Sequence, residues 1–277
     1  MSNTSGTGKN EGFRDGGVAL KKLDMHGYRR SHCWRVEETT ESLFFIDVAL
    51  PGPDSKAMRN LFEATDQCHQ RVREALDLGS ETKDKERQRR TNTWLYASDL
   101  LAEADFAESK QQKVFYGTVN PAGLHFITRG LAWDDPIVFQ CVLHEVVHFW
   151  WADQVGEAPS LLNEGVAVYF EHVLGTDTVK GRGTLRNFWH EYSGRTKPGF
   201  LRRLCSNDVF WTEKGAGEPV YEIGVQVVSF LLDTYGLQSV KHVFLGSYYD
   251  DPDLPQNIES VVGASLEYLE VKISASS

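Results

Sequence analysis

The spacing of apolar residues changes near residue 130. Before this point, short runs rich in aromatic and β-branched residues are separated by turn-forming residues, a pattern typical of strands. After it, apolar residues recur every three or four positions, as on the buried faces of helices. The pattern predicts strands at 27–38, 42–50, 92–98 and in a hairpin at 117–130, and helices at 134–154, 160–175, 184–194, 198–206, 220–236 and 239–250.

One helix is expected among the strands. Asp54 or Ser55 is a good N-cap, and apolar residues from Met58 onward recur at helical spacing until about Gly79. The segment 100–112 is predicted as a short helix or an irregular stretch.

Strands followed by helices, without regular alternation, favour an α+β fold over a parallel α/β sheet. We expect three parts in the chain. The polar, Gly/Ser-rich tail at 1–17 is predicted to be disordered. A mixed α/β N-terminal lobe with the strands is expected at 18–133, and a helical lobe at 134–277.

Composition and charge argue against several function classes. The chain has 277 residues and a formal net charge of −10, and its densest basic run, 83–90, also contains acids. Nucleic acid and anionic membranes are therefore not expected as partners. No apolar run approaches a membrane span, and the N-terminus lacks the apolar core of a signal peptide, so a cytoplasmic location is expected. The four cysteines are widely spaced without a CxxC pair, which predicts reduced thiols.

The candidate chemistry lies in the segment CVLHEVVHFWW. His144 and His148 are four residues apart, so they share one face of a helix and can both bind one metal ion. Neutral imidazole is a good ligand for Zn²⁺, and Glu145, beside that face, is placed to act as general base toward a water molecule. The alternative is an amphipathic helix whose polar residues border a cleft. The helix is apolar almost all round, however, and buried His and Glu side chains need partners such as a metal ion.

A third ligand is predicted on the next helix. Glu164, in the segment LLNEGVAVYFE, follows His148 by sixteen residues and has apolar neighbours one turn away. An acid in such surroundings is costly unless it is paired or binds a metal. Two histidines and one glutamate would leave a fourth position of Zn²⁺ open, and the ligand types do not exclude another divalent metal.

The segments HEVVH and NEG together resemble those of the gluzincin metallopeptidases, nearest to the aminopeptidase N type and the peptidase MA-like families. The resemblance covers about 134–236 and implies a zincin-like fold with the metal site in the cleft between two lobes. It also implies His144, His148 and Glu164 as zinc ligands and Glu145 as the base. The gap between the two segments is short, which favours a compact relative over a member of the aminopeptidase N family.

The segment VYEIG, at the start of a later helix, is similar to the tyrosine-glutamate-x-glycine helix start of the same families. This resemblance implies that the phenol of Tyr221 stabilises the oxyanion formed when water attacks a carbonyl. The alternative is a core tyrosine at a helix start. The families also bind substrate along an edge strand, to which the strand carrying His125 would correspond; the preferred alternative for His125 is packing between strands. The segment NPAGLHFITRG lacks the acid with which the aminopeptidases hold a free amino group, so exopeptidase specificity is not implied.

Several further residues have open interpretations. Glu171 is two helical turns beyond Glu164 and can accept the free N–H of a ligating histidine, or it is a surface acid. Asn163 either orients the site or caps its helix. Cys141, His172 and His190 are interpreted as packing or surface residues.

Three functions fit these residues. The first is a zinc-dependent metallopeptidase that acts on a peptide or protein. The second is a zinc-dependent hydrolase or transferase that acts on a non-peptide amide in a biosynthetic pathway. The third is a non-catalytic binding protein with a zincin-like fold, against which the presence of both Glu145 and Tyr221 argues. The sequence does not indicate an oligomeric state.

Overall fold

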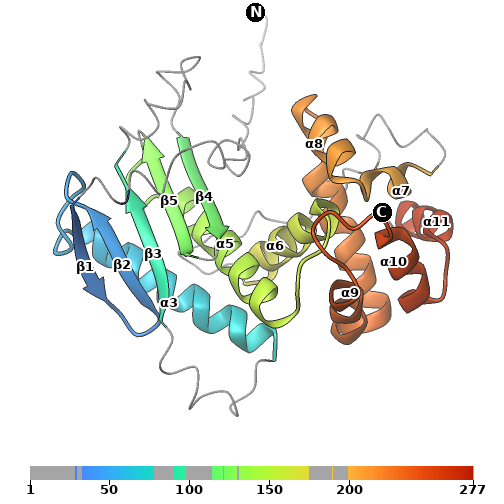
Figure 1. Ribbon diagram of the computed structural model, residues 1–277, viewed down its shortest axis with the longest axis horizontal. Helices are drawn as coiled ribbons and strands as arrows, with labels where there is room; N and C mark the ends of the chain where they lie inside the picture. Colours follow the sequence, from blue (N-terminus) through green and yellow to red (C-terminus); the bar gives the residue numbers. More distant parts are fainter. Residues whose placement is uncertain are drawn as a thin grey trace, which may run out of the picture.

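The computed structural model describes residues 29, 33–77, 90–97, 114–120, 122–129, 131–174, 189 and 199–276 (Figure 1). The described part consists of a five-stranded sheet with helices, and all of its strands precede residue 130. The described part is therefore mixed α/β and compatible with the predicted α+β class, and the predicted change from strands to helices near residue 130 is confirmed. The predictions for 1–17 and 100–112, and for 184–194 apart from Trp189, lie outside the described residues.

The sheet is mixed, with the strand order β1-β2-β3-β5-β4. Its two outer pairs, β1 with β2 and β5 with β4, are antiparallel, and its two inner pairs are parallel. The strand bounds are Trp34–Glu38 for β1, Ser42–Asp47 for β2, Thr91–Tyr96 for β3, Val114–Asn120 for β4 and Gly123–Arg129 for β5. The hairpin predicted at 117–130 is confirmed.

The structure corrects the prediction for the edge strand. β5, the strand that carries His125, pairs with β3 on one side and with β4 on the other, so it lies inside the sheet. The outer strand on this side of the described sheet is β4. The sequence pattern shows that two strands form a hairpin, but it does not show which of them pairs with a distant third strand.

Two helices cover one face of the sheet, α3 (Lys56–Ala75) and α5 (Pro136–Gln154) (Figure 1). Their starts follow from local chemistry. The Ser55 hydroxyl accepts a hydrogen bond from the backbone N–H of Met58, and the Asp135 carboxylate accepts one from the N–H of Ile137. Pro136 occupies the first turn of α5, where a missing N–H costs nothing.

The remaining helices follow α5 in the chain. They are α6 (Ser160–Leu174), α7 (Phe200–Leu204), α8 (Asn207–Gly215), α9 (Val220–Leu245), α10 (Leu254–Val262) and α11 (Leu266–Ser276). The two helices predicted at 220–236 and 239–250 are joined in α9 across a non-helical residue, Gly236, while α8, α10 and α11 were not predicted. None of the described helices is both long enough and apolar enough to cross a membrane.

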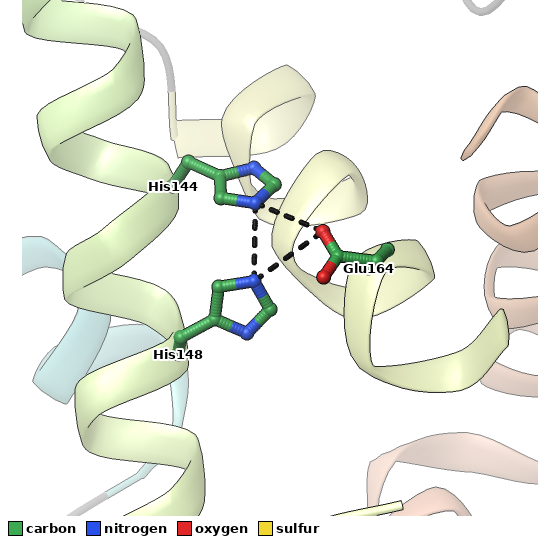
Figure 2. Close-up of side chains that lie close together, drawn as sticks. All are labelled: His144, His148 and Glu164. Carbon is green, nitrogen blue, oxygen red and sulfur yellow. Dashed lines mark hydrogen bonds and ion pairs between the residues drawn. The ribbon is translucent and has the colours of Figure 1, made fainter. Parts of the chain in front are cut away.

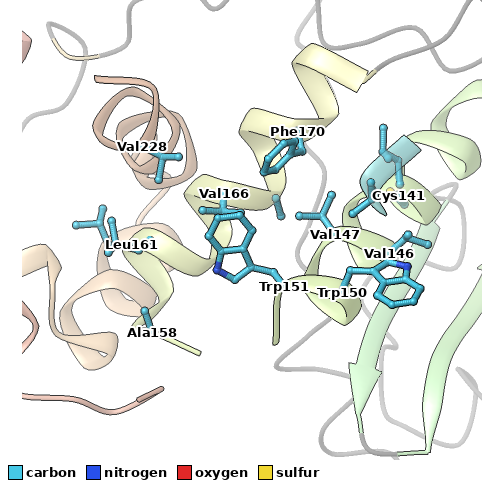
Figure 3. Close-up of a cluster of buried hydrophobic side chains, with 14 of the residues drawn as sticks. Cys141, Val146, Val147, Trp150, Trp151, Ala158, Leu161, Val166, Phe170 and Val228 are labelled. Carbon is cyan, nitrogen blue, oxygen red and sulfur yellow. The ribbon is translucent and has the colours of Figure 1, made fainter. Parts of the chain in front are cut away.

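The core between α5, α6 and α9 is apolar and closely packed (Figure 3). Trp151 on α5 is 2% exposed, and its ring lies 6.0 Å from that of Phe170 on α6 and 5.0 Å from that of Phe244 on α9. Because α5 also packs against α3 and β4, it is the element through which the sheet and the later helices are joined.

Helices α6 and α9 cross at two glycines. A Cβ atom on Gly224 would lie 2.6 Å from the carbonyl oxygen of Leu161, and one on Gly165 would lie 2.5 Å from the carbonyl oxygen of Gly224. Such separations are too short for any carbon–oxygen contact, and the oxygens belong to helix backbone that cannot rotate away. A side chain at either position would therefore force the two helices apart.

We expect Gly224→Ala to lower the free energy of unfolding by about 3 kcal/mol, because overpacking against backbone outweighs the gain in helix propensity. Thermal or urea unfolding of the purified variant measures this loss. Gly215→Ala, in the last turn of α8, is the matched control: its Cβ would meet nothing within 4 Å, so little change is expected. Equal stability of the two variants would contradict the close helix crossing.

Candidate metal centre

Two imidazoles project from one face of α5 (Figure 2). His144 and His148 are one helical turn apart, and their Nε2 atoms lie 3.0 Å from each other. Both side chains are partly buried, with 15% and 13% exposure. The i, i+4 spacing in the sequence therefore produces the predicted convergence of two ring nitrogens.

A carboxylate from α6 meets the two imidazoles. Oε2 of Glu164 lies 3.2 Å from Nε2 of His144 and 3.5 Å from Nε2 of His148. The start of α6 is fixed by α8, because the side-chain Oδ1 of Asn207 accepts a hydrogen bond from the backbone N–H of Ser160. The proposed capping role of Asn163 is wrong, since Asn163 lies inside the helix and Asn207 supplies the cap.

The geometry of His144, His148 and Glu164 fits a metal ion. Their candidate ligand atoms all lie within 4.8 Å of one another. Two neutral imidazole lone pairs and a carboxylate oxygen repel one another at such distances unless a positive charge lies between them. A proton can supply part of this charge, and a divalent cation supplies more of it.

The pKa shifts point to the same need for positive charge. Burial lowers the pKa of His144, but the carboxylates of Glu171 and Glu164 outweigh burial, so its pKa lies well above the usual value. Burial raises the pKa of Glu164, but the imidazoles of His148 and His144 outweigh it and hold that pKa far below the usual range. Both shifts show that the ionised carboxylates and a positive charge on the imidazoles stabilise each other at this point.

Glu171 orients the first histidine. Its side chain is 1% exposed, and its Oε1 accepts a hydrogen bond from Nδ1 of His144. Its Oε2 accepts a second hydrogen bond, of 2.9 Å, from the amide of Gln140. The surface-acid interpretation is therefore wrong. When His144 is neutral, as a metal ligand must be, its Nδ1 carries the proton donated to Glu171 and its Nε2 presents a lone pair toward His148 and Glu164.

Glu145 lies against the outer strand of the sheet. A Cβ atom on Gly117, in β4, would be 2.7 Å from Cγ of Glu145 and 3.0 Å from its Oε1. Only a glycine leaves room for the glutamate in this position. The side chain of Glu145, which belongs to the same helix as the two histidines, therefore lies beside strand β4.

Tyr221 lies in the first turn of α9 and is partly buried. Its ring centroid is 5.7 Å from that of Phe210 on α8, and the Lys214 ammonium lies 3.7 Å from the Tyr221 centroid. The helix crossing brings its turn near Glu164, because Gly224 contacts Gly165, the residue after Glu164. The aromatic packing fits a core tyrosine, and the proximity of the two turns fits a role in the site, so the predicted role of Tyr221 stays a prediction.

His125 has a packing role. It is fully buried, its Nδ1 lies 2.7 Å from the hydroxyl of Tyr96, and its Nε2 lies 2.9 Å from Oδ1 of Asn120. Burial, with a smaller contribution from Arg29, lowers the pKa of His125 to about 3, so its ring is neutral. The preferred interpretation of His125 is confirmed.

Among the described candidates, Cys141 and His172 do not belong to the group of converging ligand atoms. Cys141 is buried and, like the other three cysteines, forms no disulfide, as predicted. His172 is partly buried near the end of α6, and His190 lies outside the described residues.

Comparisons with protein-family models, with curated proteins and with solved structures return no match to this chain.

We expect Glu171→Gln to weaken metal binding about 10- to 100-fold, because the neutral amide no longer increases the basicity of His144. Titration of the metal-free protein with Zn²⁺ in competition with a chelator measures this change, and the binding capacity at saturation should stay the same. Glu63→Gln, an exposed position on α3, removes the same charge and should not alter affinity. Wild-type affinity in the Glu171 variant would contradict its orienting role.

Proposed function

We propose that the protein is a zinc-dependent metallopeptidase with a zincin-like fold, related to the gluzincins. The observation that carries this proposal is the convergence of His144, His148 and Glu164 on one point, with a separate carboxylate, Glu145, beside them. The ligand set binds the metal, and the additional carboxylate performs proton transfer.

The donor set fits Zn²⁺. Tetrahedral zinc binds imidazole nitrogen and carboxylate oxygen at about 2.0–2.1 Å, which separates neighbouring ligand atoms by roughly 3.3 Å. The three separations here are 3.0, 3.2 and 3.5 Å. When bound, zinc would supply the positive charge that makes a water molecule more acidic and polarises the substrate carbonyl.

The chain's own residues would carry out the proton transfers. Glu145 accepts the proton of the attacking water and then donates it to the nitrogen of the leaving amine. Its contact with Gly117 places the side chain beside β4. Glu145 therefore acts as a base without being a ligand.

A peptide is the substrate that the neighbouring strand favours. β4 is the outer strand of the described sheet and passes directly beside Glu145. An extended peptide can pair with such a strand through main-chain hydrogen bonds, which would place one of its carbonyl groups near the base. This arrangement favours peptide hydrolysis over the alternative reaction on a small non-peptide amide.

Tyr221 is the proposed oxyanion donor. Its phenol would donate a hydrogen bond to the carbonyl oxygen as negative charge develops there. The contacts of its ring with Phe210 and with the Lys214 ammonium, both on α8, limit the positions that the hydroxyl can adopt.

The test is cleavage of a peptide mixture by the zinc-loaded protein, followed by mass spectrometry. We expect wild type to cut peptides and Glu145→Gln to be slower by at least about 100-fold while keeping its zinc, because only the base is lost. Tyr221→Phe should be slower by about 100-fold or more through a lower kcat. Undiminished cleavage by Glu145→Gln would overturn the proposed mechanism.

A further inference from the structure

A cavity lies at the end of the sheet, and its lining does not include His144, His148 or Glu164. It has a volume of about 580 Å³ and is lined by the end of β4, the start of β3 and the last turns of α5. Its apolar wall includes Val119, Phe149 and Trp150, and its polar wall includes Asn120, Asp153 and Glu157. The volume lies within the range of pockets that bind small molecules or side chains.

The cavity continues the path along β4 that begins at Glu145. Gly117 contacts Glu145, and Asn120, three residues further along the strand, lines the cavity. Phe149 and Asp153 lie one and two turns after Glu145 on α5 and line the same cavity. Three residues of a strand span about 10 Å, and the four to eight residues from Glu145 to Phe149 and Asp153 span about 6–12 Å of helix, so β4 and α5 advance together from the base to the cavity.

The charges around the cavity favour a cation. Asp153 and Glu157 are exposed acids, and the C-terminal end of α5 adds partial negative charge with no basic residue in its last turn. The one basic residue of the lining, Arg90, is engaged elsewhere. Its guanidinium lies 2.7 Å from the carboxylate of Glu38 and donates a hydrogen bond to the carbonyl of Thr39.

Asn120 is held in a fixed orientation at this cavity. Its Oδ1 accepts hydrogen bonds from the ring Nε2 of buried His125 and from the backbone N–H of Ala122, at 2.9 and 2.8 Å. The oxygen is therefore used inside the protein, and the amide N–H groups are the part that can contact a ligand. A donor of this kind suits a main-chain carbonyl, which a peptide carries next to each side chain.

We propose that this cavity binds a basic side chain of the peptide substrate, about three residues from the bond that faces Glu145. The proposal rests on the proposed peptidase function. The apolar wall contacts the methylene stem of a lysine or arginine, and the carboxylates of Asp153 and Glu157 pair with its charged end. When a peptide pairs with β4, the residue spacing along the strand places one of its side chains at the cavity.

Two measurements test the proposal separately from catalysis. The first compares the peptides cut by wild type and by Asp153→Asn/Glu157→Gln, counting lysine and arginine at each position around the cleaved bond. The second follows, by NMR of the zinc-loaded Glu145→Gln protein, the binding of a capped hexapeptide of alanines with one central lysine. The same peptide with norleucine in place of lysine is the ligand control. Glu63→Gln/Glu74→Gln, at two exposed positions on α3, is the matched charge control.

We expect basic residues to be enriched about three positions from the cut, and this enrichment to be lost in the cavity variant alone. The lysine peptide should shift the signals of Asn120 and Asp153 and bind at least about tenfold more tightly than the norleucine peptide, as expected for a charged hydrogen bond. Cleavage without basic enrichment, together with equal binding of both peptides, would overturn the cavity proposal and leave the peptidase intact.

Absence of cleavage with lysine-specific binding that the cavity variant loses would overturn the peptidase and support the cavity as a site for cationic side chains. Absence of both would overturn both proposals. Thermal unfolding of the cavity variant is expected to match that of the charge control, because both acids of the cavity are exposed.

Discussion

The convergence of three electron-pair donors between α5 and α6 is the constraint on which the candidate site depends. Two imidazole nitrogens and a carboxylate oxygen lie 3.0–3.5 Å apart in a partly buried place, where only a positive charge makes their approach favourable. Buried Glu171 accepts a hydrogen bond from Nδ1 of His144 and so leaves Nε2 to face the other two groups. The surrounding packing holds the groups together, and a bound cation would convert their repulsion into attraction.

Close backbone contacts place the groups around this point. Gly165 and Gly224 let α6 and α9 touch, so that the turn with Glu164 lies against the turn that follows Tyr221. Gly117 lets Glu145 lie against β4. In each case the absence of a side chain allows a segment with a candidate site residue to approach a segment that is distant in the chain. The positions of Glu145, Glu164 and Tyr221 therefore depend on these glycines.

Local chemistry made part of this structure predictable from the sequence. Ser55, Asp135 and Pro136 mark helix starts that the structure reproduces, and the spacing of His144 and His148 fixes their common face. Glu164 was identified because an acid among apolar residues needs a partner. These inferences use only neighbours within a few turns of one helix or the composition around one residue.

Features that depend on distant partners were not predictable in the same way. The position of β5 inside the sheet follows from its pairing with β3, and the cap of α6 comes from Asn207 on a helix that was not predicted. The role of Glu171 was undecided until its burial against His144 was seen. The cavity at the end of β4 joins residues from four elements, β3, β4, β5 and α5, so no single segment of sequence carries its signal.

The most direct test of the account is the zinc content of the purified protein, measured by elemental mass spectrometry for wild type and Glu164→Ala after incubation with Zn²⁺ and removal of the excess. The account predicts about one zinc per chain in wild type and little or none in the variant, with both proteins folded. Glu63→Ala, at an exposed position on α3, should bind zinc as wild type does. A folded wild type that stays metal-free would show that the two histidines and Glu164 are helix packing, and the catalytic proposal would fall with it.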